Sequence, residues 1–154
     1  MIFIGIDPGA SGGLVAMTHD RLLSCVSMPD SELAVWEWFA QWMGTDRVFA
    51  VLEKVAGYQG GVGAPGSAMF KFGHGYGGLR MALVGCKIPF DEVPPQKWQK
   101  ALGCGTRAKT ESKADWKNRL KGRAQALFPT EKVTLATADA LLMAEYNRRT
   151  RVWE

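Results

Sequence analysis

The stretch that decides the fold is Met1-Ile-Phe-Ile-Gly-Ile-Asp-Pro-Gly-Ala-Ser-Gly-Gly13. Residues 2–6 are apolar and rich in isoleucine, the composition of a strand that is buried on both faces. The run stops at Asp7, and Pro8 and Gly9 predict a turn directly after it. A carboxylate is therefore expected at the carboxyl end of a core strand. Because Asp is also a common turn former, its role depends on which groups the rest of the chain places beside it.

A second apolar run repeats this pattern. Residues 47–53 read as a strand, and that strand ends in Glu53. If the two strands are parallel neighbours, Asp7 and Glu53 lie side by side at one edge of the sheet. Two carboxylates in one cleft repel each other unless a cation lies between them.

The remaining pattern predicts an α/β fold in one domain, residues 1–154. Residues 12–17 and 21–28 read as strands that complete an antiparallel meander of three. The other predicted elements are helices at 31–43, 67–86, 96–102, 110–128 and 135–149 and a strand at 87–93, with Ser31 or Asp30, Ser67, Thr110 and Thr134 as helix caps. The expected architecture is a five-stranded mixed sheet, with three antiparallel strands followed by parallel ones, flanked by helices.

The helix predicted at 31–43 carries an apolar stripe at helical spacing, formed by Leu33, Trp36, Phe39, Ala40 and Met43. Its expected use is packing in the core or in a dimer. The helix at 67–86 contains several glycines, for which we expect either close packing on the sheet or approach to a DNA backbone.

The composition excludes several classes of protein. Of the 154 residues 47% are hydrophobic and 22% are charged, as in ordinary soluble domains. No apolar run approaches the ~20 residues that span a bilayer, and the N-terminus does not read as a signal peptide. The three cysteines have neither metal-type nor disulfide-type spacing, so a reducing cytoplasm is expected.

The charge of the chain is unevenly distributed. Residues 1–96 carry six Lys/Arg and nine Asp/Glu, whereas residues 97–151 carry thirteen and five. A basic second half indicates a polyanion-binding surface beside the acidic site. The alternative is that these lysines only solvate helix faces.

A glycine-rich segment, residues 54–66, follows Glu53 directly and is expected to contact substrate. Tyr58 is its one aromatic residue. No Gly-Lys-Ser/Thr follows, so the segment is not a nucleotide-binding P-loop.

Four motifs, in this order along the chain, carry a family resemblance. They are Gly5-Ile-Asp-Pro-Gly9, Val51-Leu-Glu53, Pro94-Pro-Gln-Lys-Trp-Gln-Lys100 and Ala138-Asp-Ala-Leu-Leu-Met-Ala-Glu-Tyr146. The chain resembles the ribonuclease H-like nucleases, and more narrowly the RuvC family of Holliday-junction resolvases, most of all its phage-encoded members. The resemblance implies a homodimer that serves DNA recombination and repair by cutting opposed strands of a four-way junction.

The resemblance also implies roles for individual residues. Asp7, Glu53 and Asp139 match the family's metal-binding carboxylates, whose oxygens suit Mg²⁺ or Mn²⁺. Two ions about 4 Å apart activate the attacking water and stabilise the leaving 3′ oxygen. The expected products are paired nicks with 5′-phosphate ends. No nucleotide cofactor and no membrane partner are implied.

The sequence departs from the family pattern at two positions. The family's usual fourth ligand lies three residues before the last Asp, where this chain has Ala136. A hydroxyl of Thr137 or Thr134, or a water molecule, is expected to substitute for that missing ligand. A Phe that stacks on junction bases in some relatives is replaced by Ala56, and Tyr58 is the candidate substitute.

Five lysines are expected to neutralise DNA phosphates: Lys97, Lys100, Lys109, Lys113 and Lys117. The resemblance places essential lysines in this region. Lys100 is our first choice, and Lys113 the second, for a cation that stabilises the transition state.

Three other functions compete with this one. The first motif also resembles the phosphate loop of actin-like kinases and ATPases, but those proteins close two such domains around ATP. A non-catalytic branched-DNA-binding protein fits the loss of a ligand at Ala136. A broader nuclease that also cuts flaps and forks fits a phage protein acting in the host cytoplasm.

Overall fold

The chain builds one mixed sheet of five strands in the order β3-β2-β1-β4-β5. This computed structural model describes residues 1–55 and 65–151. The strands are β1 (Ile2–Asp7), β2 (Gly13–Met17), β3 (Leu22–Ser27), β4 (Val48–Glu53) and β5 (Phe90–Val93). β2 is antiparallel to both β1 and β3, whereas β4 is parallel to both β1 and β5. The predicted sheet is confirmed.

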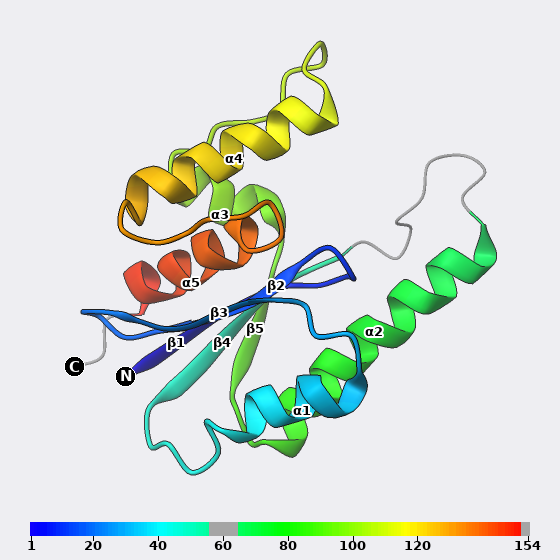
Figure 1. Cartoon of the computed structure of the whole chain (residues 1–154), viewed down its shortest axis with the longest axis vertical. Helices are drawn as coiled ribbons and strands as arrows, with labels where there is room; N and C mark the ends of the chain where they lie inside the picture. The colour runs from blue at the N-terminus through cyan, green and yellow to red at the C-terminus, as the bar shows by residue number, and fades with distance from the viewer. Residues whose placement is uncertain (56–64, 152–154) are drawn as a thin grey trace.

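Helices cover both faces of the sheet (Figure 1). They are α1 (Glu32–Ala40), α2 (Gly66–Gly85), α3 (Pro95–Ala101), α4 (Lys113–Leu127) and α5 (Ala138–Thr150). Successive side chains of a strand point to opposite faces. Phe3 therefore packs in the core beneath α3, α4 and α5, and Ile4 in the core beneath α1 and α2. The expectation that the first strand is buried on both faces is correct. None of the described helices has the length and apolar character needed to cross a membrane.

The helix α5 lies directly on β1 because Gly5 has no side chain. A Cβ at Gly5 would lie 2.2 Å from the carbonyl oxygen of Ala140 and 2.3 Å from the amide nitrogen of Ala144. Further along the helix, the buried Asn147 donates hydrogen bonds from Nδ2 to the carbonyls of Ile4 (3.0 Å) and Phe49 (2.9 Å). These contacts set the position of α5 on the sheet and, with it, the position of Asp139.

Several predicted helix starts are wrong. The helix expected to be capped by Thr110 is α4, and its cap is Ser112, whose hydroxyl accepts from the Asp115 amide at 3.0 Å and donates to the Asp115 carboxylate at 2.7 Å. This reciprocal bonding gives Ser112 the advantage over Thr110. The cap of α2 is Pro65 rather than Ser67, and no side chain caps this helix.

The last helix and the last strand also start later than predicted. The cap of α5 is Thr137 rather than Thr134, because the hydroxyls of these two threonines bond each other at 3.0 Å and form a turn before the helix. The predicted strand at 87–93 shortens to β5, since Lys87 has a left-handed φ of 56° and Pro89 has no amide hydrogen to donate.

The apolar stripe predicted for α1 is buried in the core only in part. Phe39 is fully buried, but Leu33, Trp36 and Met43 are 64%, 46% and 46% exposed. The face that packs on the sheet includes Trp38, whose indole nitrogen donates to the Ser24 hydroxyl at 3.0 Å. This hydrogen bond favours burial of Trp38 over Trp36.

Candidate active site

Asp7 and Glu53 end neighbouring strands of the sheet. β1 and β4 are parallel, and their register pairs Ile6 with Leu52, so the next residue on each strand is a carboxylate at the same edge. Asp7 is 8% exposed and Glu53 is half-buried. The placement that the two apolar runs predict is the one observed.

Asp139 brings a third carboxylate from the opposite layer. It is the second residue of α5 and is 4% exposed. Its Oδ2 accepts a hydrogen bond from the ammonium of Lys117 on α4, while its buried Oδ1 has no hydrogen-bond partner among the described residues. Three carboxylates, here called the carboxylate cluster, therefore come together from β1, β4 and α5, and Lys117 reaches them from α4: the cluster is Asp7, Glu53 and Asp139.

The pKa values of two carboxyl groups show that the charges of the cluster act on one another. Burial, followed by the negative charges of Asp139 and Glu53, raises the pKa of Asp7 to about 8. Burial and the charge of Asp139 raise the pKa of Glu53 to about 7. A hydrogen bond from the Trp98 indole nitrogen to Glu53 Oε2, at 3.0 Å, partly offsets that rise. The cluster is thus short of positive charge.

Lys117 is the cation that the described residues supply to this cluster. Burial lowers the pKa of Lys117, but Asp139 foremost, together with Asp7 and Glu53, raises it by more, so the net shift is upward. The side chain therefore stays an ammonium at neutral pH. Lys117 is one of the lysines predicted to bind phosphates, and its contact with Asp139 was not predicted. The only signal for this contact in the sequence is that Lys117 directly follows Trp116, which is buried in the structure.

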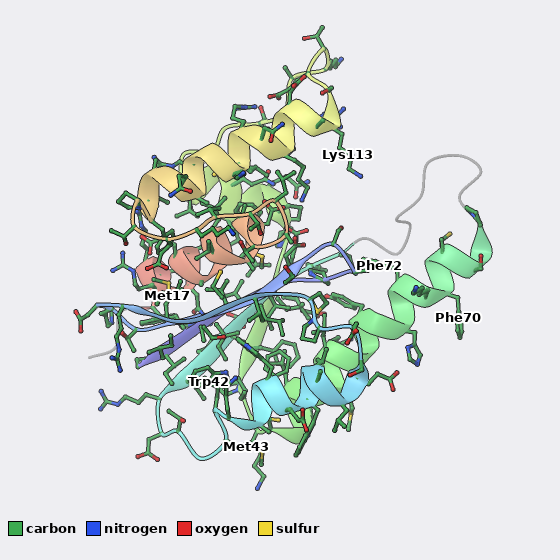
Figure 2. All side chains as sticks on the ribbon, in the orientation of Figure 1. Met17, Trp42, Met43, Phe70, Phe72 and Lys113 are labelled. Atoms are coloured by element: carbon green, nitrogen blue, oxygen red, sulfur yellow. The ribbon has the colours of Figure 1, made fainter. Side chains whose placement is uncertain are left out.

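The other predicted lysines lie outside the cluster. Lys97 and Lys100 are exposed on α3, and Lys109 is exposed in the segment before α4. Lys113, at the first turn of α4, is exposed at the outer end of that helix (Figure 2). Lys100 forms no ion pair within the described residues, whereas Lys117 does. The predicted base-stacking residue Tyr58, and Ala56 with it, lie outside the described residues.

The turn after Asp7 packs against α2. Gly9 has a φ of 101°, and a Cβ there would lie 3.2 Å from the ring of Phe72. Phe72 lies beside this turn (Figure 2) and stacks on Tyr76 with ring centroids 6.5 Å apart. This aromatic pair was not predicted, although the spacing of Phe72, Tyr76, Leu79 and Leu83 follows one helix face.

The glycines of α2 do not pack on the sheet. A Cβ at Gly73, Gly75, Gly77 or Gly78 would meet no described atom within 4 Å. Of the two uses expected for them, close packing on the sheet is therefore wrong.

The proposed substitutes for the missing fourth ligand are already engaged. The hydroxyls of Thr134 and Thr137 bond each other, and each also accepts from the other's backbone amide. Ala136 itself lies in the turn before α5, outside the helix that carries Asp139. Its carbonyl oxygen would lie 2.7 Å from a Cβ on Gly13, which shows how closely this segment approaches β2.

The donor set suits a hard divalent cation in its chemistry. Three carboxylates converge, two with raised pKa values, and Asp139 Oδ1 is buried and unpartnered. As the described side chains are arranged, however, no group of three His, Cys, Asp or Glu residues is in position to hold a metal ion.

Comparison with known proteins identifies the fold of this chain but finds no sequence relative. No family model matches the chain, and no curated protein sequence matches it. The structure of Thermus thermophilus RuvC is similar, with a TM-score of 0.63 and 17% identity over 97% of this chain and 96% of that one. Thermus thermophilus RuvC in complex with its Holliday junction substrate gives a TM-score of 0.65 at the same identity and coverage. The chain thus has the fold of RuvC, the ribonuclease H-like fold that its motifs predicted.

Proposed function

We propose that this protein is a structure-specific DNA endonuclease that resolves four-way junctions and cuts other branched DNA. The observation that carries the proposal is the carboxylate cluster: Asp7, Glu53 and Asp139 come from three elements and meet at the carboxyl edge of a RuvC-like sheet. A protein of this fold, Thermus thermophilus RuvC, has been solved with a Holliday junction. Buried carboxylates beside a basic surface are an arrangement suited to metal-assisted phosphodiester hydrolysis.

We propose Mg²⁺ as the cofactor, with Mn²⁺ as a substitute, held by Asp7, Glu53 and Asp139. When bound, the metal supplies a nucleophile from water and charge stabilisation at the scissile phosphate. Two ions per site are the number that the family resemblance implies.

The chain's own residues prepare the site for a phosphate. Trp98 orients Glu53 through its indole hydrogen bond, and Lys117 offsets part of the negative charge that repels DNA. Because the cluster is buried, these charges interact more strongly than they would in water. Hydrolysis without a covalent enzyme intermediate leaves a 5′-phosphate and a 3′-hydroxyl.

The exposed lysines supply the DNA-binding surface in this proposal. Lys97, Lys100, Lys109 and Lys113 lie on α3, on α4 and in the segment between them. Contacts of these side chains with phosphates make binding weaken steeply with salt. Lys100, exposed on α3, remains our proposed cation for the transition state.

The proposed homodimer uses an exposed stripe on α2. Phe70, Met81 and Val84 are 76%, 66% and 58% exposed, and with Gly73 and Gly77 they follow helical spacing along one face, here called the α2 stripe. Large exposed apolar side chains on one face are typical of an interface. Two symmetric cuts also need two active sites.

We assign the protein to a reducing cytoplasm, that of a host cell if a phage encodes it. Cys25, Cys86 and Cys104 are free thiols, all of them half-buried or buried, which is consistent with this assignment.

A second candidate is a branched-DNA-binding protein without catalytic activity. The ion pair of Lys117 with Asp139 favours it, because a carboxylate held by an ammonium is less available to a metal. Junction binding without cleavage would be its signature.

The test is cleavage of a labelled four-way junction compared with a matched duplex, with Mg²⁺, Mn²⁺ or EDTA. We expect paired nicks that need metal and are lost in Asp7→Asn. Asp46→Asn, an exposed carboxylate before β4, is the matched control and should cut normally. Tight junction binding without cleavage in either metal would refute the nuclease and support the second candidate.

A further inference from the structure

The two carboxylate oxygens of Asp139 have different partners. Oδ2 is held by the Lys117 ammonium, and Oδ1 is buried with no partner among the described residues. The side chain of Asp139 is 6% exposed and that of Lys117 is 38% exposed. A free carboxylate would offer both of its oxygens to metal ions, but here the ammonium of Lys117 holds one of them.

The backbone that carries Lys117 is firmly placed. Trp116 and Leu120 on either side of it are buried in the core. Arg119 donates to the carbonyls of Cys104 and Thr106, and Arg123 donates to the carbonyl of Leu102. These bonds tie α4 to the segment that follows α3, so the ammonium is presented to Asp139 from a fixed helix.

The charges also balance with a single metal ion. Ionised Asp7, Glu53 and Asp139 carry three negative charges, of which Lys117 offsets one. One divalent cation offsets the remaining two. A second divalent cation would add charge next to an ammonium that already occupies Asp139, which is unfavourable in a buried site.

We infer that Lys117 takes the place of a second metal ion, so that this site binds one divalent cation through Asp7, Glu53 and Oδ1 of Asp139. The inference rests on the proposed function and revises the number of ions that the family resemblance implies. Lys117 is then a positioning residue: it acts through Asp139 and leaves one of its oxygens for the metal.

The test counts bound Mn²⁺ in the absence of DNA, by titration calorimetry and by the free-Mn²⁺ signal in electron paramagnetic resonance. We expect the wild type to bind about one Mn²⁺ per chain, and Lys117→Met, in which Oδ2 is released, to bind about two. Lys117→Arg retains the charge and should stay at one. Lys113→Met removes the same charge one turn earlier on α4, from an exposed position, and should also stay at one.

Circular dichroism and thermal melting of each variant establish that it is folded before ions are counted. If Lys117→Met does not fold, Lys117→Gln takes its place. Two ions on the wild type, or a single ion on the folded charge-removing variant, would overturn the inference.

The outcome is separable from that of the proposed function. A wild type that binds two ions and cuts junctions refutes the role of Lys117 and leaves the nuclease intact. A wild type that binds no Mn²⁺ and cuts nothing refutes both.

Discussion

Asp7 is the residue whose burial most strongly disfavours the charged form that metal binding requires. Its carboxyl group lies among two other carboxylates, and its pKa rises from 3.8 to about 8, mainly because of burial. A folded state that holds a proton more tightly than the unfolded state loses stability as the pH rises. In metal-free protein this loss runs between about pH 4 and pH 8, the interval between the two pKa values.

We therefore predict that the metal-free protein becomes less stable from pH 5 to pH 8, by on the order of 3 kcal/mol. The Asp7→Asn variant has no carboxyl group to ionise at this position and should show a shallower dependence, to which Glu53, with a pKa raised to about 7, still contributes. Urea unfolding in EDTA across this pH range measures both.

Asp46→Asn serves as the control, because that side chain is exposed and should leave the pH dependence unchanged. Equal slopes for wild type and Asp7→Asn would mean that Asp7 ionises normally in the folded protein.

At the scale of elements, α4 holds the segment before it in place through Arg119. Its guanidinium donates to the carbonyls of Cys104 and Thr106, and also to both carboxylate oxygens of Glu111 at 3.0 and 2.9 Å. The pKa of Glu111 is lowered, first because of its hydrogen bond from Arg119. The flat fork of a guanidinium makes these contacts together, which a lysine ammonium does not.

We predict that Arg119→Lys loosens residues 103–111 while the sheet stays intact. Amide hydrogen exchange in this segment should accelerate by about 10-fold or more, because its opening no longer breaks the Arg119 contacts. Junction affinity should fall as well, since Lys109 lies in the same segment.

The matched variant is Arg80→Lys, because the Arg80 guanidinium makes an ion pair with the half-buried Glu92. It should leave exchange in residues 103–111 unchanged. Unaltered exchange in Arg119→Lys would show that the segment is ordered by other contacts.

At the scale of the whole molecule, the two faces of the sheet differ in what they leave exposed. The layer with α3, α4 and α5 carries Lys117 and the exposed lysines proposed to bind DNA, whereas the layer with α1 and α2 carries the α2 stripe (Figure 1). A dimer formed through α2 would leave the basic surface of each subunit free for DNA.

We predict that Met81→Glu abolishes the proposed dimer and leaves a monomer, because it places a charge in the α2 stripe. Sedimentation equilibrium would measure the mass, and junction cleavage by the variant should give single nicks that are no longer paired. Leu135→Glu, at a residue 49% exposed in the other layer, should remain dimeric. A wild type that is a monomer at every concentration would rule out the interface.

The sequence by itself determined the sheet and the position of the carboxylates. The alternation and length of apolar runs reveal strands, and parallel strands bring their ends together, so Asp7 and Glu53 could be located from local pattern alone. Asp139 was located through its motif. These are properties of short stretches of chain.

Only the tertiary structure decided which lysine meets the carboxylates and which tryptophan is buried. Lys117 and Asp139 are 22 residues apart, on helices whose relative placement depends on the fit of Ala140 and Ala144 against Gly5. Trp38 is buried in place of Trp36, with its indole bonded to Ser24 on a separate strand. Helical periodicity gives the spacing along one element but not its rotation against the next, and side-chain packing between elements sets that rotation.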